Sequence, residues 1–98
     1  MTNARITLIT GGAAGIGLAT AVRFAKAGDH VVIADILEDK AREAVTSIVE
    51  SGGQASFYHL DVADDDQIFR VVQAIEDTEG AIDALVTCAG ILQNPGSI

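Results

Sequence analysis

Short apolar runs alternate with helical patterns along the whole chain. Residues 5–10, 30–35, 55–61 and 82–88 are rich in β-branched and other apolar side chains, which is typical of strands. The run at 30–35 shows no polar alternation, as expected of a parallel strand that is buried on both faces. Between the runs, apolar residues recur at spacings of three and four, which indicates amphipathic helices. The three helical stripes are Leu18, Ala21, Val22 and Ala25; Ala41, Ala44, Val45, Ile48 and Val49; and Ile68, Val71, Val72 and Ile75.

Glycines and one acidic residue mark where these helices end and begin. Gly28, Gly52–Gly53 and Gly80 follow the three stripes, where a left-handed residue would end each helix. Asp64 can cap the third helix, with Gln67 three residues later in the position of a capping box. The order β-α-β-α-β-α-β predicts an α/β fold, a partial three-layer Rossmann-type doubly wound parallel sheet with right-handed crossovers. In its strand order 3-2-1-4, ligands bind beyond the carboxyl ends of the strands, where the order reverses.

Composition and charge exclude several classes of partner. The 98 residues are 49% hydrophobic with a single proline, which is typical of an ordered globular segment. Fourteen acidic against six basic residues give a net charge of −8 without a basic cluster, so nucleic acid is not an expected partner. No run approaches the roughly 20 apolar residues of a membrane span, and the N-terminus does not read as a signal peptide. The single cysteine, Cys88, fits a reducing compartment, so we expect a cytoplasmic protein with no membrane partner.

The loop after the first strand carries the clearest chemical signal. Its sequence is Thr10-Gly11-Gly12-Ala13-Ala14-Gly15-Ile16-Gly17. Glycines let the main chain approach a ligand, and the free N–H groups at the start of a helix favour a phosphate. Because no large side chain precedes Ile16, a pyrophosphate could lie directly against the main chain.

Three other kinds of glycine loop fit less well. A nucleoside-triphosphate loop needs a lysine after its last glycine, and Leu18 follows Gly17 here. The fingerprint Gly-x-Gly-x-x-Gly fails because Gly15-x-Gly17 is followed by Thr20. A methyl-donor site usually has an acidic residue before its glycines, where this chain has Thr10. A tight turn that binds no ligand is the remaining alternative.

An acidic residue, Asp35, ends the second strand 18 residues after Gly17. A carboxylate at about this separation accepts hydrogen bonds from the adenosine ribose hydroxyls of a dinucleotide. The 2′-phosphate of NADP would place like charges about 4 Å apart, a cost on the order of 1 to 4 kcal/mol. Ile36 and Leu37 supply no cation to offset this repulsion, so the sequence predicts NAD in preference to NADP. A solvated acid at a strand end is the alternative.

The pattern Thr-Gly-x-x-x-Gly-x-Gly resembles the motif of the short-chain dehydrogenase/reductase family, and it is matched by Thr10, Gly11, Gly15, Ile16 and Gly17. The resemblance implies an oxidoreductase that transfers hydride between NAD(H) and an alcohol or ketone. It also implies a full-length protein that is a homo-oligomer. The cofactor-binding residues that it suggests, together with Asp35, are Gly11, Gly15, Ile16, Gly17, Ile36, Asp61, Val62, Cys88, Ala89 and Gly90.

Two further segments match the family less closely than the glycine loop. Asp61-Val62 resembles the family's Asp-Val pair, whose carboxylate accepts a hydrogen bond from the adenine amino group. An acid at a strand end is again the alternative. The segment 87–90 aligns with the family's Asn-Asn-Ala-Gly, but Thr87 and Cys88 replace both asparagines. Their amides could have tied neighbouring loops together, which puts loop rigidity and cofactor affinity in doubt.

The family's catalytic Ser, Tyr-x-x-x-Lys and Asn align beyond the end of these residues. The single tyrosine, Tyr58, is followed four positions later by Val62, so no catalytic residue is assigned. No metal site is expected, because the two histidines have no partner at metal-ligand spacing. The aromatic residues Phe24, Phe57, Tyr58 and Phe69 are expected in the core or at its boundary.

We expect residues 1–98 to be the N-terminal portion of one Rossmann domain, truncated, with the fourth strand at an open edge and no dehydrogenase turnover on their own. Two alternatives to an enzyme fragment remain: a stand-alone dinucleotide-binding or regulatory module, and a fragment that another chain completes.

Overall fold

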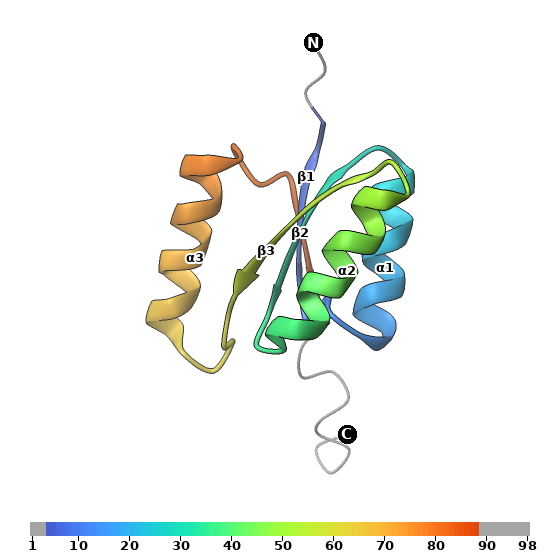
Figure 1. The fold of residues 1–98 in the computed structure, drawn as a ribbon. Helices are drawn as coiled ribbons and strands as arrows, with labels where there is room; N and C mark the ends of the chain where they lie inside the picture. Colours follow the sequence, from blue (N-terminus) through green and yellow to red (C-terminus); the bar gives the residue numbers. More distant parts are fainter. Residues whose placement is uncertain (1–3, 89–98) are drawn as a thin grey trace, which may run out of the picture.

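The strands form one parallel sheet between two layers of helices. The computed structural model describes residues 4–88, and Figure 1 shows helices on both faces of a twisted sheet. Its strands stand in the order β3-β2-β1-β4, and all three pairings are parallel. This arrangement confirms the predicted α/β fold class and the strand order 3-2-1-4. The strand bounds are β1 Ile6–Thr10, β2 His30–Asp35, β3 Gln54–His59 and β4 Ala84–Thr87.

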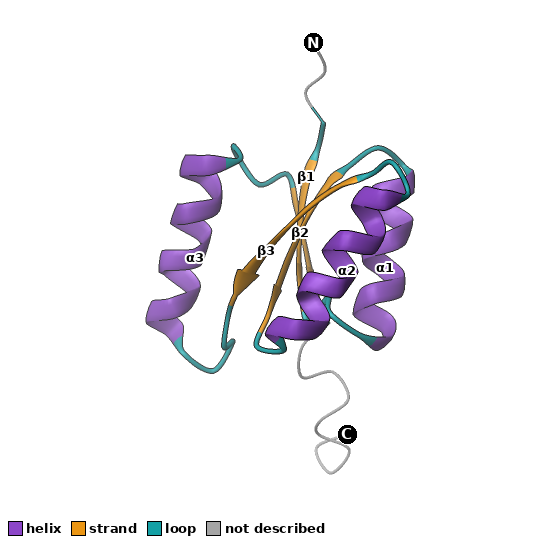
Figure 2. Cartoon of the chain, viewed as in Figure 1, coloured by secondary structure: helices purple, strands orange, loops and turns teal. Residues whose placement is uncertain are grey.

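Each helix crosses from one parallel strand to the next. Their bounds are α1 Gly15–Lys26, α2 Glu38–Glu50 and α3 Asp65–Thr78. Helices α1 and α2 lie side by side on one face of the sheet, and α3 lies on the other face (Figure 2). The described part of the chain therefore has the three layers that alternating strands and helices predict.

The two faces of the sheet carry separate apolar cores. The core beneath α1 and α2 includes Ile9 and Ile33, and the core beneath α3 includes Val32 and Ile75. Neighbouring residues of β2 thus point into different cores, as the alternation of side chains along a strand requires. All of β1 and five of the six residues of β2 are buried. This burial confirms the interpretation of the apolar run at 30–35 as a strand covered on both faces.

The predicted helix ends are present, with one difference in the capping box. Gly28, Gly52 and Gly80 have φ of 102°, 94° and 118°, the left-handed conformation expected after a helix. Asp64 caps α3 by accepting a hydrogen bond from the Gln67 N–H at 3.1 Å. The Gln67 side chain does not return to the Asp64 N–H, which donates to the Asp61 carbonyl at 3.0 Å. The Gln67 Oε1 accepts from the Asp61 N–H at 2.6 Å instead.

Several expected positions need correction. The third strand spans Gln54–His59 where 55–61 was expected, and the fourth spans Ala84–Thr87 where 82–88 was expected. Phe69 is 77% exposed, although we expected it in the core or at its boundary. On α3 it follows Ile68, which packs on the sheet, so it is turned about 100° away from the buried face. Val49 is exposed for the same reason, because it follows the buried Ile48.

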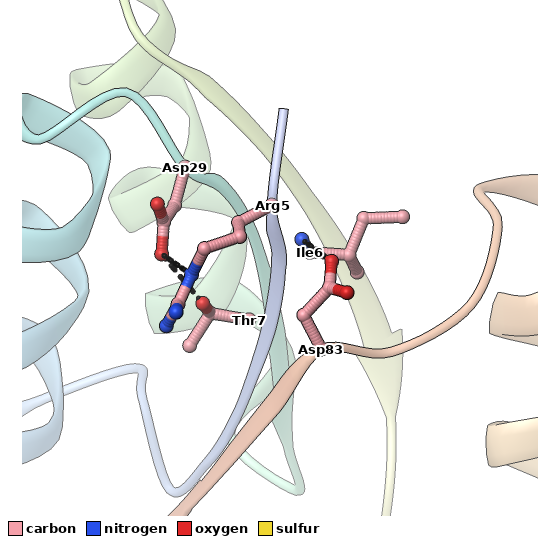
Figure 3. Close-up of polar contacts among 5 residues, drawn as sticks. All are labelled: Arg5, Ile6, Thr7, Asp29 and Asp83. Atoms are coloured by element: carbon pink, nitrogen blue, oxygen red, sulfur yellow. Dashed lines mark hydrogen bonds and ion pairs between the residues drawn. The ribbon is translucent and has the colours of Figure 1, made fainter. Parts of the chain in front are cut away.

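Two carboxylates hold the start of β1, one on each side of the strand (Figure 3). Asp29, just before β2, accepts a hydrogen bond from the Thr7 hydroxyl at 2.7 Å, and the Arg5 Nε lies 3.6 Å from the same oxygen. Asp83, just before β4, accepts from the Ile6 N–H at 2.8 Å. These contacts join β1 to both neighbouring strands at the amino-terminal edge of the sheet. The residues of the predicted site lie at the opposite edge of the sheet.

Candidate functional site

The loops that follow β1, β2 and β3, together with Cys88 after β4, meet at the carboxyl edge of the sheet, which is the lower end of the described residues in Figure 1. Main-chain hydrogen bonds join neighbouring loops there. The Gly11 N–H donates to the Ala34 carbonyl at 2.8 Å, and the Leu60 N–H donates to the Asp35 carbonyl at 3.1 Å. The Cys88 N–H donates to the Thr10 carbonyl at 2.9 Å. The structure therefore brings the predicted segments together at one edge; the predicted residues Ala89 and Gly90 lie outside the described residues.

Three positions of the loop require glycine, two because of their backbone conformation and one because of a close contact. Gly11 and Gly15 adopt φ of 74° and 60°, which L side chains rarely adopt. Gly17 has ordinary helical backbone, but a Cβ there would lie 2.8 Å from the Gly11 carbonyl carbon and closer still to its oxygen. The loop therefore folds back against the first turn of α1, and only a residue without a side chain permits this approach.

The first turn of α1 leaves its main-chain donors available. Its N-cap is Ala14, which has no side chain able to accept a hydrogen bond, and the first helical bond runs from Leu18 N–H to the Ala14 carbonyl at 3.3 Å. Within residues 4–88, the N–H groups of Gly15, Ile16 and Gly17 have no hydrogen-bond partner. The positive end of the helix and these free donors together favour an anion.

The other two described helices begin differently. The first turn of α1 has no acidic residue, whereas α2 begins with Glu38 and Asp39 and α3 with Asp65 and Asp66. Helix α3 also has its Asp64 cap. In a chain with a net charge of −8, acidic side chains thus occupy two helix starts and are absent from the third. The start of α1 is where a phosphate would meet the least repulsion from its own helix.

Asp35 faces the glycine loop from the end of β2. Its side chain is buried, with 9% of the residue exposed. One carboxylate oxygen, Oδ2, accepts a hydrogen bond from the Ala13 N–H at 3.0 Å, and Oδ1 accepts from the Leu37 N–H at 2.9 Å. An ionised carboxylate can accept about four hydrogen bonds, so two donors leave room for further hydroxyl donors. The loop and the acid therefore stand in contact, as a dinucleotide site requires.

Exposed apolar side chains occur on the segments that follow β1, β2 and β3. Ile16, Ile36 and Val62 are all exposed, at the start of α1 and in the loops after β2 and β3. Asp61 is half-buried, and its Oδ1 accepts from the Ala63 N–H at 3.0 Å. Exposed apolar residues beside a polar contact can cover the flat faces of an aromatic ring, while a carboxylate such as Asp61 can accept from its amino group.

Sequence reasoning missed the residues that contribute to this edge through their main chain. Ala13 donates to Asp35 and Ala34 accepts from Gly11, and neither residue type signals such a contact. Gln67 was expected to cap α3, whereas its side chain supports the Asp61 N–H. The Leu37 contact could have been anticipated, because an Asp often accepts from the N–H two residues later.

His30 does not form a Ser-His-acid triad with its neighbours. His30 Nε2 lies 3.1 Å from Glu79 Oε1 and 3.2 Å from Ser56 Oγ. In a Ser-His-acid triad the serine and the acid face different ring nitrogens, whereas here both partners share one nitrogen. Tyr58 donates to the other Glu79 oxygen at 3.2 Å, so this cluster joins the end of α3 to β2 and β3. Among residues 4–88, we find no group of three potential metal ligands and no helix long and apolar enough to cross a membrane.

Comparison with known proteins agrees with the architecture of the fold. The protein named uncharacterized oxidoreductase YxbG of Bacillus subtilis (strain 168) is 43% identical over 94 residues, which cover 96% of this chain and 34% of that protein. The chain thus spans about one third of the length of this relative. A solved structure of NAD+-bound xylitol dehydrogenase has a TM-score of 0.80 at 32% identity. The match covers 85% of this chain and 32% of the xylitol dehydrogenase chain.

A second solved structure, an actinorhodin polyketide ketoreductase with NADPH, has a TM-score of 0.85 at 32% identity. The match covers 89% of this chain and 33% of the ketoreductase. The family model described as short chain dehydrogenase matches residues 5–98, which is nearly the whole sequence. The chain belongs to the short-chain dehydrogenase family, a family of oxidoreductases.

Proposed function

We propose that this chain binds NAD as the nucleotide-binding part of an oxidoreductase that transfers hydride between NAD(H) and an alcohol or ketone. The observation that carries the proposal is the hydrogen bond between the Ala13 N–H and the Asp35 carboxylate, 3.0 Å long, which sets the glycine loop against an acid. A loop with free helix donors suits a diphosphate, and an acid beside it suits a ribose.

Each part of the cofactor has candidate partners among the described residues. The N–H groups at the start of α1 would bind the diphosphate, and Asp35 would accept from the adenosine ribose hydroxyls. Ile36 and Val62 would contact the adenine ring, and Asp61 would accept from its amino group. The bound cofactor would supply the hydride-carrying nicotinamide. The contributions of Cys88, Ala89 and Gly90 remain proposals, as does the homo-oligomeric state of the longer protein.

The preference for NAD over NADP rests on charge, because the two solved relatives hold different cofactors. One contains NAD+ and the other NADPH, so the shared fold accommodates both. In this chain, Asp35 stands where a 2′-phosphate would approach, and the next two residues, Ile36 and Leu37, carry no positive charge. One repulsion on the order of 1 kcal/mol already lowers NADP affinity several-fold.

No residue of this chain is assigned to the proton transfer that accompanies hydride transfer. We therefore expect the 98 residues alone to bind NAD without oxidising an alcohol. A stand-alone nucleotide-binding module would behave in the same way in a binding assay. The two functions are distinguished by the gene: an in-frame Tyr-x-x-x-Lys downstream supports the enzyme, and a true stop after Ile98 supports the module or a fragment completed by another chain.

Titration calorimetry of the chain with NAD and with NADP tests the proposal. We expect NAD to bind at least about fivefold more tightly, which corresponds to about 1 kcal/mol. Asp35→Asn should reduce this preference, and Glu76→Gln is its matched control, because it also removes one negative charge, from an exposed position in the last turn of α3. Equal affinities for the two cofactors would contradict the preference, and no binding of either would contradict the function.

A further inference from the structure

The Asp35 carboxylate contacts two different loops through both of its oxygens. Oδ2 accepts from the Ala13 N–H, 22 positions earlier in the chain, and Oδ1 accepts from the Leu37 N–H. Asp35 is 9% exposed and Ala13 is 3% exposed, so the bond between them is shielded from water. Hydrogen bonds to a charged acceptor are roughly twice as strong as neutral ones, and shielding preserves that strength.

This bond is the point at which a side chain controls the glycine loop. From Gly11 to Ala14, two hydrogen bonds join the loop to β2: Gly11 N–H to the Ala34 carbonyl, and Ala13 N–H to Asp35. The first is a main-chain bond, which any residue at position 34 would provide. The second depends on the carboxylate of Asp35. Removing that carboxylate would leave the buried Ala13 N–H without an acceptor.

We propose that Asp35 is a positioning residue, which holds the glycine loop in its phosphate-binding conformation before a nucleotide arrives. This inference rests on the proposed function for its consequence, because the same carboxylate would also select NAD. Cofactor choice and loop order then depend on one side chain. A substitution of Asp35 that relieves repulsion of NADP also releases the loop that binds the diphosphate of either cofactor.

Ile36 offers a second route to NADP that leaves this bond in place. Its side chain is 54% exposed and its main chain takes no part in the contact with Ala13. Ile36→Arg would add a cation beside the 2′-phosphate without removing the Asp35 carboxylate. If Asp35 acted through charge alone, Asp35→Ala and Ile36→Arg would both improve NADP binding. If Asp35 also positions the loop, Asp35→Ala would not improve NADP binding and only Ile36→Arg would.

Amide hydrogen exchange of the nucleotide-free chain, followed by NMR, tests the positioning role directly. We expect Asp35→Ala to raise the exchange rate of the Ala13 amide at least about tenfold relative to the amide of Val32 in the core of β2. Asp35→Asn, which keeps one acceptor oxygen and the same size, gives a smaller increase and covers the case in which the alanine variant does not fold. Ile36→Arg and the control Glu76→Gln should leave the exchange rate of the Ala13 amide unchanged. Unchanged exchange in both Asp35 variants would overturn the inference.

Calorimetry with NAD and NADP separates this inference from the proposed function. We expect Asp35→Asn to weaken the binding of both cofactors, and Ile36→Arg to improve the binding of NADP about tenfold. An Asp35→Asn variant that gains NADP and keeps its affinity for NAD would overturn the positioning role alone. If the Ala13 amide exchanges faster in the Asp35 variants but the parent chain binds neither cofactor, the positioning role is supported and the proposed function alone is overturned.

Discussion

Replacing Gly17 by alanine should damage the loop far more than the same replacement at Gly12. The new Cβ at position 17 would lie 2.8 Å from the Gly11 carbonyl carbon and 3.0 Å from the Gly12 Cα, both main-chain atoms. Carbon atoms pack best at about 3.5–4.0 Å, so the main chain must move by on the order of 0.7 Å or more. At position 12 the nearest atoms are the Cγ2 methyl groups of Ile33 and Ile9 at 3.2 Å and the Ile9 carbonyl oxygen at 3.3 Å, so each neighbour must shift by only a few tenths of an ångström.

The expected free energies follow from these contacts. Overpacking costs about 1–3 kcal/mol, and we place Gly17→Ala at the upper end because main chain yields least. Alanine gains about 1 kcal/mol over glycine within a helix, which leaves a net loss of about 2 kcal/mol. Gly12→Ala should cost about 1 kcal/mol, at the lower end of the range, because the displacements that it requires are smaller.

Urea unfolding followed by circular dichroism measures both losses, and calorimetry with NAD measures the effect on the site. Displacement of the first turn of α1 should weaken NAD at least about tenfold in Gly17→Ala, the loss expected for one hydrogen bond to a charged group. A Gly17→Ala variant as stable as the parent, with unchanged NAD affinity, would refute the argument that close packing of the loop requires this glycine.

Three further predictions concern the scaffold. Ile75→Ala, at a fully buried position, should lower the free energy of unfolding by about 2–5 kcal/mol. Phe69→Ala, at a position that is 77% exposed, should lower it by less than about 0.5 kcal/mol. Equal losses in urea unfolding would contradict the burial assigned to these two residues. Asp64→Ala should cost about 1 kcal/mol through loss of the α3 cap, measured in the same way, and no loss would argue against the cap. Burial, assisted by the charge of Glu79, raises the pKa of Tyr58 above 10.0. The neutral form of Tyr58 therefore contributes stability that is fully present below about pH 10 and is lost as the pH rises through the pKa of the folded state. Absorbance of this single tyrosine should show that it titrates at a lower pH in urea-unfolded protein than in folded protein. Identical titration in both states would contradict the raised pKa.

The fold could be predicted because its signals are local and repeated. Residues 30–35 form a strand with the bounds that their uninterrupted apolar run suggests, and glycines with positive φ follow all three helices. The strand order followed from the alternation of elements, since right-handed crossovers leave few ways to arrange parallel strands. Phe69 escaped prediction because hydrophobicity alone does not determine the face of a helix; its position beside Ile68 does.

The site could be predicted only as far as side chains reveal it. Glycines and an acid at a suitable spacing pointed to the loop after β1 and to Asp35, and the structure places them in contact. The donor in that contact is the main chain of Ala13, which every residue type except proline possesses, so the sequence holds no signal for it. The same reason applies to the Asp61 N–H, which binds the side chain expected to complete a helix cap.

The two edges of the sheet differ in how their polar groups are satisfied. At the amino-terminal edge, the chain's own donors occupy the carboxylates of Asp29 and Asp83, and these bonds link β1 to both neighbours (Figure 3). At the carboxyl edge, α1 and α2 both start without a capping side chain, but only α1 also has no acid in its first turn. A helix start without a cap forgoes about 1 kcal/mol of stability. Local rules of this kind are broken at functional sites, where a ligand replaces the missing partner. The first turn of α1 follows directly on the loop whose Ala13 N–H donates to the buried carboxylate of Asp35, so an anion bound at α1 would lie near that carboxylate.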